Sequence, residues 1–135
     1  MINSVAEFLS LCPYLKGKEI NVNYLDYKDG AVTLESEGER EIVRKYADGG
    51  MLTAVGFKLI IRYSFAPEIS RNKTLAREFG NIEKWIEEQN LKGNLPEIKD
   101  GSKVVSVGVE KCFKLGKSDR NSARYEAKIE LIYLS

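Results

Sequence analysis

The sequence predicts an α+β fold: a single domain, residues 1–135, in which two helices cover one face of a mainly antiparallel β-sheet. Three observations lead to this prediction. Six stretches show the alternation of apolar and polar residues that is typical of half-buried strands. Two other stretches carry apolar residues at helical spacing. The resulting order, α-β-β-β-β-α-β-β, contains no βαβαβ rhythm, so hairpin connections and an antiparallel sheet are favoured.

A short first helix is predicted near the N-terminus. Ser4 and Glu7 have the spacing of a capping box, apolar residues then recur at helical intervals, and Pro13 ends the pattern. Cys12 falls on the apolar face of this helix, which indicates a core thiol rather than a reactive one.

Four strands are predicted between the helices, at residues 18–25, 31–36, 39–46 and 51–65. Asp29-Gly30 and Asp48-Gly49-Gly50 are turn signals between them. In the last of these strands Gly56 predicts a bulge or bend. The residues expected on the buried face of that strand are Phe57, Leu59, Ile61, Tyr63 and Phe65.

The second helix is predicted in NKTLAREFGNIEKWIEEQNLKGNLP, residues 72–96. Asn72 or Thr74 is the expected N-cap, and Gly93 and Pro96 mark the end. Its apolar stripe consists of Leu75, Phe79, Ile82 and Ile86. Two final strands follow at residues 103–113 and 124–134, joined by a polar loop at 115–123.

Composition excludes several classes of function. Twenty-one basic and twenty acidic residues give a net charge of +1, which argues against nucleic acid as the main partner. There is no histidine, the most usual general base and metal ligand. Cys12 and Cys112 show no CxxC spacing and suit a reducing cytosol, although a bridge between them stays open. We expect no signal peptide and no membrane-spanning segment.

No motif predicts catalysis, a cofactor or a metal, and we expect that the chain is not an enzyme. Gly49-Gly50 and Gly116-Lys117-Ser118 resemble phosphate cradles only superficially and are better explained as turns. Glu87-Glu88 and the glutamates of residues 37–41 are better explained as solvated charge than as acid–base pairs.

The remaining candidates are interaction residues. The run from Lys114 to Arg124 is rich in basic residues and is the best local candidate for nucleic-acid contact, but it lacks aromatic residues for base stacking. Trp85 lies on the shoulder of the helical stripe and suits either packing over the sheet or a subunit interface. The candidate interface residues are Trp85, Gly80, Lys58, Arg62, Lys117, Arg120, Arg124 and Lys128.

The layout as a whole resembles a known family. A short N-terminal helix and meandering strands precede FKLIIRYSFAPE, the helix FGNIEKWIEEQN, a Leu95-Pro96 exit and the terminal RYEAKIELIYL. This order is similar to that of the minor capsid or tail-terminator-type (head–tail joining) proteins of siphophages and prophages of Gram-positive bacteria.

The resemblance implies a tail-terminator-like fold, self-association into a ring, commonly hexameric, and contact with the tail tube and head connector. It also implies a location in the virion, or in the host cytoplasm during assembly, and at most weak contact with DNA. The alternative function is a small nucleic-acid- or ligand-binding module.

Overall fold

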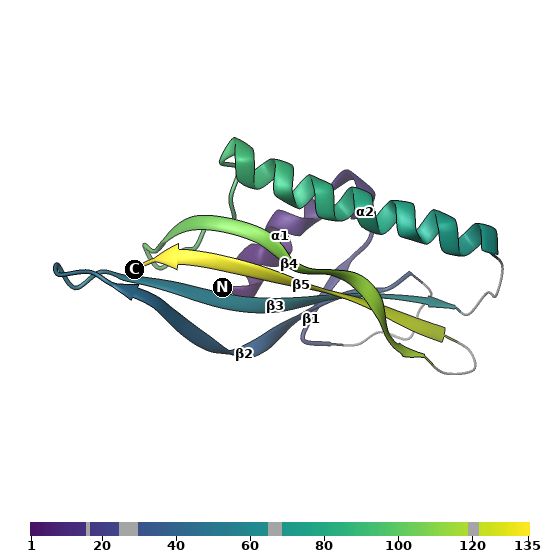
Figure 1. The fold of residues 1–135 in the computed structure, drawn as a ribbon, viewed down its shortest axis with the longest axis horizontal. Helices are drawn as coiled ribbons and strands as arrows, with labels where there is room; N and C mark the ends of the chain where they lie inside the picture. The colour runs from purple at the N-terminus through teal and green to yellow at the C-terminus, as the bar shows by residue number, and fades with distance from the viewer. Residues whose placement is uncertain (16, 25–29, 65–68, 119–121) are drawn as a thin grey trace.

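The computed structural model confirms an α+β fold with two helices on one face of a five-stranded sheet (Figure 1). It describes residues 1–15, 17–24, 30–64, 69–118 and 122–135, of which residues 39, 64, 69–75, 116–118 and 122 are described for the backbone alone. The elements are α1 (Ile2–Ser10), the 3₁₀ turn η1 (Pro13–Leu15), β1 (Ile20–Val22), β2 (Val32–Lys45), β3 (Met51–Ser64), α2 (Ile69–Lys92), β4 (Lys103–Ser118) and β5 (Ser122–Leu134).

The sheet has the strand order β1-β2-β3-β5-β4, with three antiparallel pairings and one parallel pairing. The parallel pair is β1 with β2, where Ile20 lies opposite Val32. The predicted hairpin between these two strands is therefore wrong. Asn23 ends β1 with a positive φ of 53°, which suits asparagine better than most residues. Asp29, half of the expected turn signal, lies outside the described residues.

Two of the predicted strands, 31–36 and 39–46, form the single strand β2. Gly38 lies between them with φ 96°, at a shift in the register with β3 between Ser36 and Arg40. A bulge at this glycine bends the strand without ending it. The sheet therefore has one strand fewer than predicted among the described residues.

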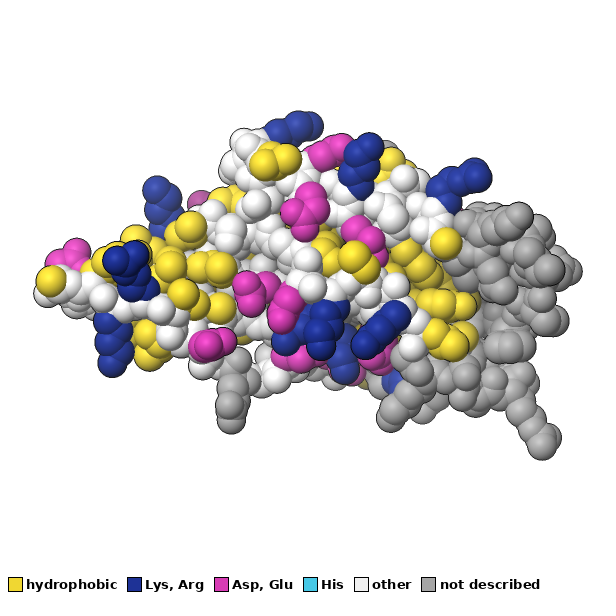
Figure 2. All heavy atoms as spheres, in the orientation of Figure 1, with side chains coloured by type: hydrophobic (Ala, Val, Ile, Leu, Met, Phe, Trp, Pro, Cys, Tyr) yellow, Lys and Arg dark blue, Asp and Glu magenta, His cyan; other side chains and the backbone are white. Residues whose placement is uncertain are grey.

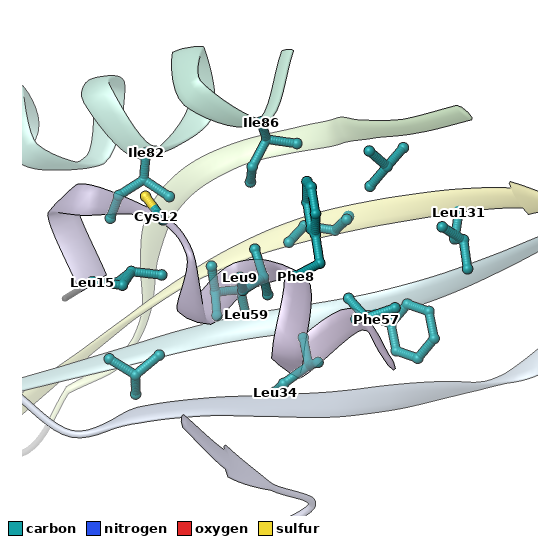
Figure 3. Close-up of a cluster of buried hydrophobic side chains, with 14 of the residues drawn as sticks. Phe8, Leu9, Cys12, Leu15, Leu34, Phe57, Leu59, Ile82, Ile86 and Leu131 are labelled. Carbon is teal, nitrogen blue, oxygen red and sulfur yellow. The ribbon is translucent and has the colours of Figure 1, made fainter. Parts of the chain in front are cut away.

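The hydrophobic core lies between the sheet and the two helices (Figure 3). The odd-numbered residues of β3 from Phe57 to Tyr63 face it, as predicted, and the first three of these four are 2% exposed or less. Ile82 and Ile86 of α2 and Cys12 after α1 are also buried there, which confirms the predicted helical stripe and the core thiol. Leu75 and Phe65 are predicted core residues whose side chains lie outside the description.

Both helices begin earlier than predicted. α1 starts at Ile2 with Met1 as its N-cap and no side-chain cap, and Ser4 lies buried inside the helix. The capping-box prediction is therefore wrong. α2 starts at Ile69, before Asn72 and Thr74. Its end is as predicted, because Gly93 adopts the left-handed conformation that glycine supplies after a helix.

The last two strands are longer than predicted. β4 continues to Ser118 and β5 begins at Ser122. Gly116-Lys117-Ser118 therefore belongs to a strand, and its prediction as a turn is wrong. Gly49, by contrast, lies in a turn with φ 91° between β2 and β3, as predicted. The described residues of the basic run, 114–118 and 122–124, lie on β4 and β5 instead of in one long loop.

Trp85 connects the two helices, since its ring lies 5.1 Å from that of Phe8 in α1, centroid to centroid. The ring is partly buried against the core.

We expect that replacing Trp85 with alanine lowers the free energy of unfolding by about 2–3 kcal/mol, through lost burial and a lost aromatic pair. Urea denaturation followed by circular dichroism measures this, because the variant has no tryptophan fluorescence. Leu91→Ala is the control, since Leu91 is 85% exposed in the same helix. Unchanged stability of the Trp85 variant with impaired self-association would instead make Trp85 an interface residue.

Candidate interaction surfaces

The face of the sheet opposite the helices carries a network of paired charges. Lys58 and Lys128 lie directly opposite each other on β3 and β5. Glu37 contacts both lysines at 3.9 Å, Glu126 lies 3.7 Å from Lys58, and Glu110 lies 3.3 Å from Lys128. Two like charges in facing positions repel, so the glutamates compensate for the pairing. The two lysines predicted as interface residues are thus brought together, and their charge is balanced by neighbouring carboxylates.

The other predicted interface residues are distributed over the molecule. Arg62 and Arg124 face each other further along β3 and β5, on the same face as the charge network. Lys117 is described for its backbone alone, in β4, and Arg120 lies outside the described residues. The structure therefore groups the candidate residues of β3 and β5 on one face of the sheet. The two candidates of α2, Gly80 and Trp85, lie on the helix that covers the other face.

A groove of about 440 Å³ lies between residues 76–83 of α2, the last part of β4 and the first part of β5. Its aromatic residues are Phe79, Phe113 and Tyr125, with Phe79 stacked on Phe113 at 4.7 Å and lying 4.9 Å from Tyr125, centroid to centroid. Leu115 borders the groove and is 54% exposed. Figure 2 shows hydrophobic side chains exposed between α2 and the strands on this side. We call this the aromatic groove.

Gly80 borders the aromatic groove from α2 and is exposed. A Cβ atom built there would meet no atom within 4 Å beyond the adjoining backbone. We expect Gly80→Ala to raise the free energy of unfolding by about 0.8–1 kcal/mol, because alanine is the better helix former and fits without strain. Thermal denaturation provides the measurement, with the exposed Leu91→Ala as a control that changes helix propensity far less than Gly→Ala. Loss of stability in the Gly80→Ala variant would contradict the prediction that an alanine side chain fits here without a steric clash.

Cys112 lies at the edge of the aromatic groove and is exposed, whereas Cys12 is buried. The negative charge of Glu83 is the main factor that raises the pKa of the Cys112 thiol. Burial raises the pKa of the Cys12 thiol. Since the thiolate is the reactive form, both thiols are less reactive than an ordinary cysteine at neutral pH.

Replacing Glu83 with glutamine should lower the pKa of Cys112, because it removes the negative charge that disfavours the thiolate. More thiolate is then present at any pH below the pKa, and iodoacetamide should alkylate Cys112 faster. The amide oxygen can still accept a hydrogen bond, so the fold is retained. Glu88→Gln is the matched control, because Glu88 is also exposed on α2 but is not among the causes of the shift in the pKa of Cys112. An equal alkylation rate in the Glu83→Gln and original proteins would contradict this electrostatic account.

Side chains of α2 close the edge of the sheet at β4. The backbone N–H groups of Val107, Val109 and Phe113 donate to the side chains of Asn90, Glu87 and Glu83, at 3.0, 3.1 and 2.7 Å. An open strand edge invites pairing with another chain, and these contacts occupy the donors that such pairing would use.

The opposite edge of the sheet, at β2, is different. Among the described strands β1 lies on this side, and its pairing with β2 ends at Leu34. Beyond it, residues 40–49 are all exposed. Ile42 is 50% exposed, Val43 53% and Tyr46 41%. We call residues 40–46 the outer β2 segment.

Of the residues at the aromatic groove, the sequence singles out Gly80 as an interface candidate but does not single out the aromatic residues as a site. The sequence predicts Phe113 at the end of a strand and Leu115 in a polar loop. Phe113 and Leu115 continue the spacing of two residues set by Val107 and Val109, and this spacing is the signal in the sequence for a longer strand. The proximity of these residues to Phe79 depends on how α2 crosses the sheet and has no signature in the sequence.

Comparison with protein-family models found no family that matches the chain, and no curated protein matches it either. Among the described residues, no three acidic, histidine or cysteine side chains gather as a metal site. Neither described helix has the length and apolar character needed to cross a membrane.

Proposed function

We propose that this chain is a structural protein of a phage or prophage: a tail-terminator or head–tail joining subunit that assembles into a ring at the end of the tail tube. Tail-tube and head-connector proteins are its proposed partners, in the virion or in the host cytoplasm during assembly. The proposal starts from the resemblance in the order of the elements, and the contrast between the two sheet edges is the observation that supports it.

The exposed outer β2 segment carries that support. Ile42, Val43 and Tyr46 place three apolar side chains in water on one short segment, at a strand edge that pairs with no other strand in the described parts of the chain. Exposed apolar groups of this kind mark surfaces that bind other proteins. At β4, by contrast, α2 side chains occupy the edge donors, so association is directed to one side of the sheet.

The charge network favours a protein-binding role over a nucleic-acid-binding module. A phosphate-binding surface needs basic groups with charge to spare, because affinity comes from neutralising phosphates. Lys58 and Lys128 are instead balanced by Glu37, Glu110 and Glu126. Such a surface suits a ring through which DNA passes with little attraction.

Light scattering over a concentration series, with negative-stain microscopy of the same samples, tests the proposal. We expect concentration-dependent self-association and ring-shaped particles, with co-sedimentation of the protein on phage tail tubes. A monomer at every concentration that also fails to bind tail tubes would overturn the proposed function. A salt-dependent shift of duplex DNA without self-association would favour the nucleic-acid-binding alternative.

A further inference from the structure

We infer that the outer β2 segment of one copy of this chain docks into the aromatic groove of a second copy. This inference rests on the proposed function, since it names the contact by which the subunits of a ring would join. Three observations carry it: the chemistry of the groove, the complementary chemistry of the segment, and the positions of the two surfaces in the fold.

The aromatic groove has unsatisfied apolar surface. The Phe79 ring is stacked on the Phe113 ring and tilted against the Tyr125 ring, and Leu115 at the border of the groove is 54% exposed. Gly80 leaves space beside them, since a Cβ atom there would meet nothing within 4 Å beyond the adjoining backbone. Burying aromatic and aliphatic surface in such a depression is the main source of binding energy at protein interfaces.

The outer β2 segment complements the groove in polarity and the adjoining helix α2 in charge. Its apolar side chains are exposed, and residues 40–46 hold three basic residues against one glutamate. In α2, residues 76–91 hold four glutamates against two basic residues. Glu83 and Lys114 are the charged residues among those that line the groove itself, so the excess of negative charge lies along α2. A basic, apolar segment thus meets an aromatic groove beside an acidic helix, which favours this pairing over contact between two identical surfaces.

The two surfaces lie at opposite ends of the sheet (Figure 1). The outer β2 segment runs to the β2–β3 turn, whereas the groove lies between the beginning of α2 and the end of β4. Because one copy cannot bring its own segment to its own groove, the contact joins different molecules. Contact between two unlike surfaces repeats from one subunit to the next, and it closes into a ring when the rotation permits.

The contact is one of side chains in a groove and does not extend the sheet. Glu83, Glu87 and Asn90 already accept hydrogen bonds from the N–H groups of β4. Val43 is suited to dock in this way, because the register between β2 and β3 shifts between Ile42 and Arg44 and leaves Val43 as the extra residue of a bulge.

A cysteine cross-link tests the inference directly, because Cys112 already lies at the groove and Cys12 is buried. The variant Val43→Cys is treated with a bismaleimide at concentrations where the protein self-associates, and the products are separated by denaturing electrophoresis. Each molecule then carries one thiol on each surface. We expect a ladder that extends beyond the dimer, with peptides around positions 43 and 112 joined in mass spectra.

The controls separate the inference from other modes of association. Val43→Cys/Cys112→Ser and Leu91→Cys should give no ladder, since the first lacks the groove thiol and Leu91 lies outside both surfaces. A strong dimer of Val43→Cys/Cys112→Ser would indicate that two outer β2 segments pair with each other, and would overturn the inference. Self-association without a 43–112 cross-link would also overturn it while leaving the proposed ring-forming function intact. Absence of any self-association together with failure to bind tail tubes, with the fold intact by circular dichroism, would remove both.

Discussion

Replacing Phe57 with alanine is expected to lower the free energy of unfolding by about 3–5 kcal/mol. Phe57 is 2% exposed and lies on the helix-facing side of β3, among the largest buried side chains of the core (Figure 3). Truncation to alanine loses the burial of the ring and leaves a cavity that the close-packed surroundings fill only in part. Since a domain of this size typically has a stability of about 5–15 kcal/mol, a large share of it is at stake. Urea denaturation with circular dichroism measures the change.

Ile42→Ala is the matched control for the Phe57 variant. Ile42 lies in the same sheet, but it is 50% exposed and loses little burial on truncation. Its expected loss of stability is below about 1 kcal/mol. Equal losses in the two variants would contradict the placement of the core between the sheet and the two helices.

The double variant Ile42→Asp/Val43→Asp is expected to weaken self-association about 100-fold while the monomer stays folded. Each substitution removes an exposed apolar side chain and would place a carboxylate against the acidic α2 of the next subunit. A cost of about 1.4 kcal/mol at each position corresponds to a tenfold rise in the dissociation constant. Sedimentation velocity over a concentration series gives the dissociation constant, and circular dichroism monitors the fold.

Leu91→Asp controls for the added charge, because Leu91 is 85% exposed and outside both surfaces. It should leave the dissociation constant unchanged. If the double variant associates as tightly as the original protein, the outer β2 segment is not the interface. If Leu91→Asp weakens association equally, the effect comes from net charge and not from a specific contact.

Much of the fold follows from local patterns in the sequence. Alternation along β3 and β5 identified which side chains face the core, because successive residues of a strand point to opposite sides. Gly93 identified the end of α2, since glycine adopts the left-handed conformation after a helix without a steric penalty. The role of Gly38 is ambiguous in the sequence, because a glycine can end a strand or form a bulge within it. Here β2 pairs with β3 on both sides of Gly38, so the glycine forms a bulge.

The candidate surfaces were predictable only in part. The alternation of charges on β3 and β5 placed Lys58 and Lys128 on one face, but their shared contacts with Glu37 depend on the path of β2. Gly80 stands out in the sequence because glycine is unfavourable inside a helix. Its position at a groove follows only from the packing of α2 beside β4.

The sequence by itself determined the two helices, most of the strand residues, the faces that the helices and β3 bury, and the α+β class, since these depend on spacings of two and of three to four residues along the chain. The tertiary structure alone decided that β1 runs parallel to β2, that α2 closes the β4 edge, and that the outer β2 segment and the aromatic groove lie at opposite ends. These features depend on contacts between residues far apart in the chain. Their energies arise only when the sheet has assembled, and so no local pattern encodes them.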